Sequence, residues 1–413
     1  MAISNGVNNY TGEYGIHRAY AIINSIKAQA TGDTSLTAVD ASTFVSVGQE
    51  LLQLGADPIF HAIAQILERT IFSVRPYEPK FRALEADSSR FGAVTRKLNI
   101  ADSDFDSATE FDLTDGQAVD HYKVKKADII QFNFYGSNAF QLQAPSWFRD
   151  QLDVAFSGPD QLEQFWGMVT QNAYDIISQA KESMARATIA NLINGLVAAK
   201  AANVKGATVI NLLQEYYDET GVELTPTTYA APTNFVNFAR WANGYFNQTA
   251  KMLSERSTVY HINKTDHEIS RHTPSDRLKA LMYSPFIEKV KSEVATVNFN
   301  DTFFNLPGYE TVNYWQSIES PDKIKSDPCY LKNDGTIDKG ATTETAHVMG
   351  VMMDEDAAGY TVCNEWVGVT PMNAKGGYVN TFYNFRIKYW NDFTENAVVF
   401  VLDNVTTEES KKK

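Results

Sequence analysis

Cysteine, long apolar runs and N-terminal targeting features are scarce or missing in this 413-residue chain. Its two cysteines, Cys329 and Cys363, cannot build a disulfide framework, so a reducing compartment is the simplest setting. No run of about 18 apolar residues is present, which argues against a membrane-spanning helix. The first residues lack the basic region and apolar core of a secretory signal peptide. We therefore expect no export signal and no membrane partner.

Basic residues are also in short supply. The chain has 36 Lys and Arg against 50 Asp and Glu, which gives a formal net charge of -14. A surface that binds nucleic acid needs clustered Lys and Arg to neutralise phosphates. The acidic excess therefore argues against a nucleic-acid-binding surface, although it is compatible with a protein that encloses nucleic acid without gripping it.

Local catalytic and cofactor motifs are absent from the sequence. There is no G-x-G-x-x-G, no G-x-S-x-G and no C-x-x-C. The segment Lys375-Gly376-Gly377 lacks the preceding glycine and the following Ser or Thr of a phosphate-binding loop. A nucleophile, a base and an orienting group cannot be assembled from such motifs. The sequence thus predicts no catalytic residues, no cofactor and no enzymatic activity.

One acidic motif has the beginning of a calcium-binding loop. Asp102, Asp104 and Asp106 alternate as the first ligands of such a loop do. The match then fails, because Ser107 stands where the loop needs glycine and Leu113 stands where it needs a bidentate Glu. A solvated acidic loop is the better interpretation.

A histidine cluster is the second candidate for a metal site. His267-Glu268 and His272 are spaced one residue further apart than in the metalloprotease pattern, and His261 lies nearby. Helix positions five apart point away from each other, so the two imidazoles would not share a metal. We interpret these as surface or interface histidines and predict no metal site. A metal-dependent enzyme that uses them remains the less favoured alternative.

The most prominent feature that is present is a long helical pattern over residues 157–200. Ser157-Gly158-Pro159-Asp160 is typical of a helix start. Apolar or small residues then follow at steps of three and four: Leu162, Phe165, Trp166, Val169, Ala173, Ile176, Ile177, Ala180, Met184 and Ala187. About 40 residues would form a helix about 60 Å long. Because the stripe is not a strict heptad, we expect a spine for an extended subunit and not a coiled-coil arm.

Residues 91–145 form a distinct block that predicts a long projecting β-hairpin. Apolar residues flank it on both sides: Phe91, Val94, Leu98 and Ile100, then Val124, Ile129, Ile130, Phe132 and Phe134. The stretch 101–120 between them is acidic and contains no Lys or Arg. Two strand-like flanks around a polar tip favour a hairpin, and a loop this long is expected to have a function of its own.

The N-terminal and central regions give weaker signals. Residues 1–40 are polar and small and indicate an arm, not a core, whereas residues 43–72 have a helical pattern. Either Thr233 or Asn234 is a possible cap for a further helix. Residues 274–294 also look helical, with a kink or break at Pro285.

The C-terminal third is the most regular part of the chain. Asn333-Asp334-Gly335 predicts a hairpin turn. Residues 348–353 indicate a buried strand, and residues 384–389 alternate between apolar and polar side chains as a half-buried strand does. Residues 397–402 form an entirely apolar strand.

The order of these elements resembles the major capsid proteins of tailed phages, which have the Hong Kong 97-type fold. Residue-level likeness lies in the segment 347–357, similar to a late axial-domain strand, and in 384–393 with 397–402, similar to the closing strand pair. The resemblance implies an α+β fold with these divisions: 1–90 N-terminal arm and lead-in, 91–145 extended β-hairpin loop, 146–205 peripheral domain with spine helix, 206–375 axial domain, 376–413 C-terminal strands returning to the peripheral domain and tail.

The same resemblance implies a structural function. The expected protein is a subunit that self-assembles, as hexamers and pentamers, into an icosahedral shell around the double-stranded DNA of a tailed phage. The expected partners are copies of itself, a portal protein and a separate scaffolding protein, since the chain lacks the long N-terminal scaffold of some family members. It would reside in the virion capsid after assembly in the host cytoplasm. An encapsulin-type nanocompartment shell protein is the alternative within the same fold.

Overall fold

The computed structural model describes residues 12–32, 37–53, 59, 62, 80–81, 84–86, 94–102, 114–117, 122, 124, 126, 129–135, 137–143, 146–148, 151, 154, 156–265, 268–297 and 309–403. Its helices are α1 (Gly12–Thr31), α2 (Ala41–Gln53), α5 (Pro159–Ala201), α6 (Leu212–Thr220), α7 (Pro232–Ser254) and α8 (Ser284–Val297). Its strands are β1 (Val94–Ile100), β2 (Ile129–Tyr135), β3 (Ser137–Gln143), β4 (Trp147–Phe148), β5 (Thr208–Asn211), β6 (Leu278–Tyr283), β7 (Tyr309–Val312), β8 (Ile324–Ser326), β9 (Cys329–Leu331), β10 (Ile337–Lys339), β11 (Thr343–Thr345), β12 (Val348–Asp354), β13 (Ala358–Val369), β14 (Tyr378–Val379), β15 (Thr381–Asn391) and β16 (Ala397–Val401).

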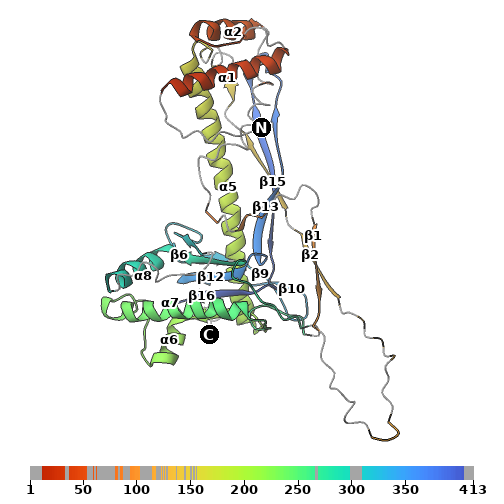
Figure 1. Cartoon of the computed structure of the whole chain (residues 1–413), viewed down its shortest axis with the longest axis vertical. Helices are drawn as coiled ribbons and strands as arrows, with labels where there is room; N and C mark the ends of the chain where they lie inside the picture. The colour runs from red at the N-terminus through yellow and green to blue at the C-terminus, as the bar shows by residue number, and fades with distance from the viewer. Residues whose placement is uncertain are drawn as a thin grey trace.

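Helix α5 runs along the long axis of the molecule and connects its two ends (Figure 1). It has 43 residues, so it is about 65 Å long at 1.5 Å per residue, and Pro159 occupies its first turn as predicted. Gly195 lets the Phe393 ring approach closely, because a Cβ there would lie 2.6 Å from the ring. The helix predicted over residues 157–200 is therefore present as one continuous helix.

The buried face of α5 lies mainly in its C-terminal half. Buried side chains recur there with helical spacing: Ala185, Ile189, Leu192, Ile193 and Leu196. Ile177 is half-buried, but Ile176 of the same predicted apolar stripe is 38% exposed, so the stripe is not buried along its whole length. The side chains of Phe165 and Trp166 lie outside the described residues.

A five-stranded sheet in the order β5-β16-β12-β6-β7 forms the lower part of the molecule (Figure 1). Every residue of β12 and β16 is buried. Val351 and Val399 join the core that faces α5, whereas Met352 and Val398 join the core that faces α7 and α8. Because helices cover both faces, these strands have continuous apolar sequences instead of alternating ones.

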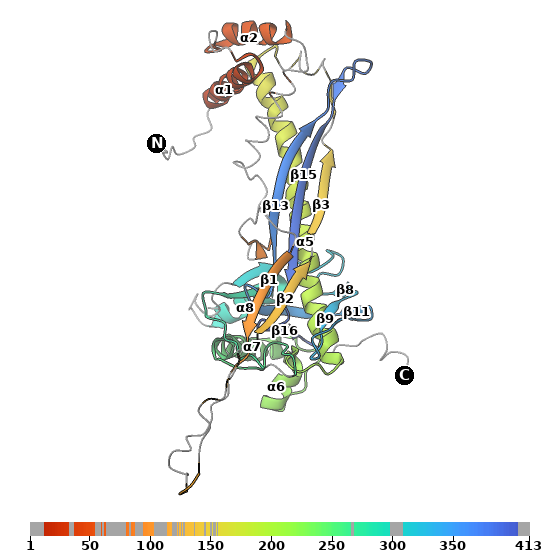
Figure 2. The same ribbon diagram turned by 90° about the vertical axis from the view of Figure 1, so that its right-hand side faces the viewer.

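A second sheet, in the order β13-β15-β3, lies along α5 (Figure 2). Phe385 and Ile387 of β15 point into the core, as the alternation predicted. The expected closing pair does not form, because β15 pairs with β13 and β3 whereas β16 pairs with β12 and β5. The turn between β15 and β16 thus carries the chain from one sheet to the other. The expected division between 375 and 376 therefore does not follow the sheets. Strand β13, which lies within 206–375, pairs beside α5, and β16, which lies within 376–413, belongs to the five-stranded sheet.

The N-terminal region contributes a small core of its own. Ile23 and Ile26 of α1 are fully buried with Phe44, Val47 and other side chains near the start of α5. The expectation of an arm without a core is therefore wrong for α1, because its short apolar patch is covered by α2. Part of the predicted helix 43–72 is present as α2, and most of the remainder lies outside the described residues.

Two helix predictions in the central region need correction. Residues 278–283 form β6, a strand hydrogen-bonded on both sides, because pairing within the sheet overrides a helical pattern. The helix α8 begins just after it, with Pro285 in the first turn. Helix α7 starts from Ala231 with Pro232 in its first turn, and no side chain caps it, so neither Thr233 nor Asn234 is the cap.

Two predicted connections join antiparallel strands. Strands β9 and β10 are antiparallel and joined through Asn333-Asp334-Gly335, where Gly335 has φ 85°. Strands β1 and β2 form an antiparallel pair, with Ile100 opposite Ile129, but residues 137–143 of the block predicted as a hairpin form β3 and pair with β15 in the body. Within the described residues no helix has the length and apolar character needed to cross a membrane.

Candidate functional site

A cluster of charged side chains, two of them buried carboxylates, lies at the junction between the β1–β2 hairpin and the body (Figure 1). Its floor is the turn between β15 and β16, where the buried Asp392 accepts hydrogen bonds from the amide and hydroxyl of Thr394 at 2.9 and 2.6 Å. These bonds fix the turn locally. Glu395 is also buried, so the turn presents two carboxylates from a region of low water access.

Lys97 of β1 forms ion pairs with both carboxylates. Its Nζ donates to Asp392 and to Glu395, and Arg271 contacts the same Glu395 carboxylate at 2.9 Å. Burial raises the pKa of Glu395, although Lys97 and Arg271 act in the opposite direction. A buried carboxylate needs such partners, because desolvation of an unpaired charge is expensive.

Asp102 makes a second polar contact just beyond the end of β1. Its carboxylate accepts from the Ser270 amide at 2.7 Å and from Arg256 at 2.6 Å, while its own amide donates to the Glu268 carbonyl at 3.2 Å. The hydrogen bond from Ser270 and the nearby Arg256 lower the pKa of Asp102. Together, Lys97, Asp102, Arg271, Asp392 and Glu395 are called the hairpin junction below.

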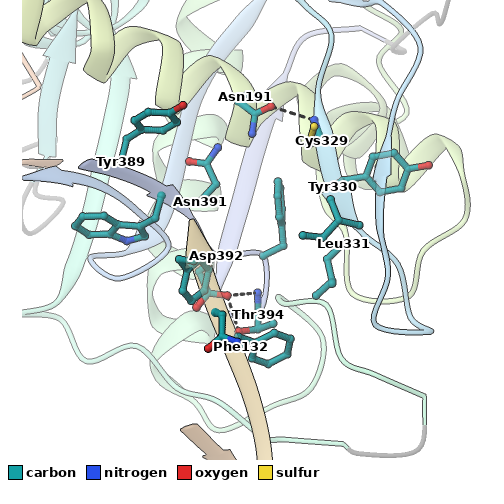
Figure 3. A pocket seen from close by; sticks show the side chains of 14 residues that line it. Phe132, Asn191, Cys329, Tyr330, Leu331, Tyr389, Asn391, Asp392 and Thr394 are labelled. Atoms are coloured by element: carbon teal, nitrogen blue, oxygen red, sulfur yellow. Dashed lines mark hydrogen bonds between the residues drawn. The ribbon is translucent and has the colours of Figure 1, made fainter. Parts of the chain in front are cut away.

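A groove of about 420 Å³ lies beside the hairpin junction (Figure 3). Phe132 of β2, Tyr330 and Leu331 of β9, and Asn391 at the end of β15 contribute to its mainly apolar lining. Across the groove, Asn191 of α5 accepts a hydrogen bond from the Cys329 amide at 3.0 Å. The groove offers apolar contacts, and its lining presents no arrangement of nucleophile and base.

The outer face of the hairpin carries exposed apolar side chains near the ends of the strands. Leu98, Ile100 and Ile129 are 66%, 63% and 59% exposed, and Ile100 lies directly opposite Ile129. These three residues are called the hairpin strip below. Contiguous exposed apolar side chains on a strand pair mark a surface that binds another protein. The hairpin thus has an inner face held to the body by Lys97 and Phe132 and an outer face that exposes the hairpin strip to solvent.

The histidine cluster is dispersed in the structure. His261 is buried, with Nε2 2.7 Å from the Ile269 carbonyl and Nδ1 3.0 Å from Asn396 Oδ1, so its interpretation as a surface histidine is wrong. Burial lowers its pKa. Glu268 pairs with Lys205, and His272 is exposed. His267 lies outside the described residues.

The described residues contain no group of three His, Cys, Asp or Glu side chains placed to hold a metal ion. Of the incomplete calcium motif, Asp102 belongs to the hairpin junction. Asp104, Asp106, Ser107 and Leu113 lie outside the described residues.

Sequence comparison supplies the family. The family model described as Phi29-like phage major capsid protein matches residues 21–401. The chain belongs to this family. As a member of this family, the chain is a structural subunit of a phage capsid shell, not an enzyme, and its place is the virion capsid. No curated protein matches the sequence.

Solved phage structures are similar to this capsid subunit at low identity. One is the capsid structure of Staphylococcus phage Andhra, with 7% identity, TM-score 0.49, and coverage of 80% of this chain and 87% of the other. A chain in a structure of the head fiber and inner core protein gp22 of bacteriophage P68 has 9% identity, TM-score 0.48, and coverage of 79% and 85%. The capsid structure of cyanophage P-SCSP1u has 12% identity, TM-score 0.45, and coverage of 80% and 90%.

Sequence reasoning missed the members of the hairpin junction. Lys97 and Asp392 are 295 positions apart, so no local spacing connects them. A partial signal was present, since the Asp392-Phe393-Thr394 segment has the Asp and Thr of a side-chain-stabilised turn. That turn lies directly between two apolar strands, a position from which its carboxylates could not reach water freely.

Proposed function

We propose that this capsid subunit forms the hexamers and pentamers of an icosahedral shell around double-stranded DNA, and that its hairpin packs on a neighbouring copy. The hairpin strip carries the proposal. Leu98, Ile100 and Ile129 are exposed in the single subunit, and their burial against another copy would release about 25 cal/mol for each Å² of apolar surface covered. Members of a shell family bind copies of themselves, so a second copy is the natural occupant.

The proposed division of labour follows the two sheets. We assign the five-stranded sheet with α6, α7 and α8 to the axial domain, and α5 with β3, β13 and β15 to the peripheral domain. Residues 91–135, the part of the 91–145 block that precedes β3, are the extended loop, and the residues before it are the arm and lead-in. Strand β16 then belongs to the axial domain, where it lies between β5 and β12.

The remaining partners are also proposals. A separate scaffolding protein would guide assembly, and a portal protein would occupy one position in the shell. Assembly would take place in the host cytoplasm. DNA would be enclosed without sequence-specific contacts, in keeping with the net charge of -14.

A deletion and a substitution test the hairpin. Removing residues 103–120 keeps Asp102 and the paired strands, so the subunit should fold and fail to form shells. The double variant Ile100→Ser/Ile129→Ser should likewise lose assembly with little change in stability, since both side chains are exposed. Negative-stain microscopy of subunits expressed with their scaffold measures assembly, and thermal unfolding measures folding.

The matched control lies on the same face of the hairpin. Gln131→Ser changes an exposed polar residue that pairs with Leu98, and it should leave assembly unchanged. Normal shells from the double isoleucine variant would contradict the proposal. Loss of assembly in Gln131→Ser would show that a polar change on this face also prevents assembly. The apolar character of the hairpin strip would then not explain the loss of assembly in the double variant.

A further inference from the structure

Among the described residues, two polar contacts hold the hairpin to the body, and both come from the β1 side. Lys97 enters the turn between β15 and β16, and Asp102 bonds to the segment 268–270 and to Arg256. Five residues of extended chain span about 17 Å. One contact would let the hairpin pivot, whereas two contacts this far apart fix its direction.

We propose that Lys97 is the positioning residue of the hairpin: its ammonium group sets the direction in which the β1–β2 hairpin leaves the body. The consequence for assembly rests on the proposed packing of the hairpin on a neighbouring copy. The positioning itself is a property of the single subunit and is tested there.

The two contacts differ in how exposed their side chains are, and the contact of Lys97 is the more buried one. The side chains of Asp392 and Glu395 are 4% and 10% exposed, while those of Arg256 and Asp102 are 64% and 33% exposed. Exposed ion pairs contribute little because water and salt screen them. Buried carboxylates that lose a cation are strongly destabilised. The body therefore favours the docked position of Lys97 more strongly than the docked position of Asp102.

The arrangement also explains why the cation comes from the hairpin. Arg271 belongs to the body. Among the ion pairs of the described residues, it contacts Glu395 but not Asp392. Lys97 bridges both. Withdrawing the hairpin would leave two buried acids beside one guanidinium. The two carboxylates of the turn thus have both of their cations only when β1 lies against the body. In this arrangement Phe132 of the paired strand β2 also packs on the main core.

The test measures the hairpin direction by the distance between two spin labels. One label is placed at Gln131→Cys on the hairpin and one at Lys251→Cys on α7, both exposed positions, in a chain with Cys329→Ser and Cys363→Ser. Pulsed electron spin resonance on the unassembled subunit should give one narrow distance peak. The peak should be lost to a broad distribution in Lys97→Met and kept in Lys97→Arg, which preserves the charge.

A second variant protects the test against misfolding. Asp392→Asn/Glu395→Gln removes both carboxylate charges while the Asn oxygen still accepts the Thr394 hydrogen bonds. It should fold, as checked by thermal unfolding, and should lose the narrow peak as Lys97→Met does. Lys205→Met is the matched control, because it removes the exposed Lys205–Glu268 pair beside the same segment, and it should keep the narrow peak.

The outcomes separate this inference from the proposed function. A narrow peak at the wild-type distance in the Asp392→Asn/Glu395→Gln variant would overturn the positioning role, whether or not shells form. Loss of the peak together with normal assembly of the hairpin deletion would support positioning and remove the proposed role of the hairpin in assembly. Loss of the peak in Lys205→Met as well would also overturn the assignment to Lys97.

Discussion

At the scale of single residues, the sharpest constraint is at Gly206, in the turn after α5. Its φ is 95°, and a Cβ there would lie 1.9 Å from the carbonyl oxygen of His261. Both the backbone conformation and the close approach of the His261 segment require glycine. The residue thus links the end of the spine to the segment that carries the hairpin junction's Arg271.

We predict that Gly206→Ala lowers the free energy of unfolding by more than about 3 kcal/mol, because backbone must move to admit the methyl group. Gly221→Ala is the control: its φ is 72°, but no atom lies within 4 Å of the added Cβ. That variant should lose only about 1–2 kcal/mol for the left-handed conformation. Urea unfolding of the unassembled subunit measures both values, and equal losses would contradict the argument.

His261 predicts a specific dependence of stability on pH. Burial lowers its pKa below the ordinary value of 6.5, so the unfolded chain binds the proton more readily than the folded one. The stability contribution of neutral His261 is full above pH about 6.5 and is lost as pH falls through the lower folded pKa. Stability should therefore fall as pH drops below about 6.5.

The variant His261→Gln isolates this contribution, since it has no titrating group in that range. Urea unfolding of both proteins at several pH values gives a difference in free energy at each pH. Contributions from Glu395 and other acids are common to both proteins and cancel. The advantage of the wild type should shrink as pH falls, and a constant difference would show that His261 does not titrate as its burial implies.

At the scale of elements, strand and helix patterns were predicted well where the burial of each face decides them. The β12 segment is apolar throughout because helices cover both faces of its sheet, and β15 alternates because one face is less buried. Prediction failed where pairing partners decide. Strand β6 has a helix-compatible sequence, and β15 and β16 are adjacent in sequence but pair in different sheets. Local periodicity contains no information on partners that lie far along the chain.

The attachment of the short strands to α5 depends on one buried side chain. Asn194 donates to Ser326 Oγ at 2.8 Å and to the Thr343 carbonyl at 3.0 Å, and it accepts from Thr345 Oγ1 at 2.8 Å. We predict that Asn194→Leu costs at least about 3 kcal/mol, because several buried polar groups lose their partner at once. Chemical unfolding measures this loss.

Asn191→Ala, one helical turn earlier, is the comparison for Asn194. It removes the bond from the Cys329 amide, and Cys329 is exposed, so water replaces the lost acceptor. The expected cost is about 1 kcal/mol. If Asn194→Leu cost no more than Asn191→Ala, the network around Asn194 would not be what holds β8 and β11 to the spine.

At the scale of the whole molecule, the elongated shape was predictable because a helix of this length cannot be enclosed by one compact core. The hairpin was predictable as an element for the same kind of reason: its acidic tip could not enter a core. The hairpin junction was not predictable, because it joins Lys97 to a turn 295 positions later. Its members are ordinary charged residues whose importance comes from burial, which depends on the assembled fold.

The charge of the whole subunit gives the last prediction, which concerns DNA. Packaged DNA must slide along the inner wall of a shell during filling and release, and dense Lys and Arg would hold its phosphates through counterion release. A chain with 50 acidic and 36 basic residues is expected not to retain duplex DNA. An equally simple reason for the charge is solubility, which net charge supports in any fold. The two explanations differ in where the basic residues lie, since a non-retaining wall needs few unpaired Lys and Arg side chains on its inner side.

A gel-shift of purified subunits with duplex DNA at about 150 mM salt tests whether the subunit retains DNA, because a non-specific binder would still show a dissociation constant of about 10⁻⁴–10⁻⁶ M. We expect no shift in that range. A shift that disappears steeply as salt rises would reveal a basic surface concealed by the net charge and would exclude a non-retaining wall.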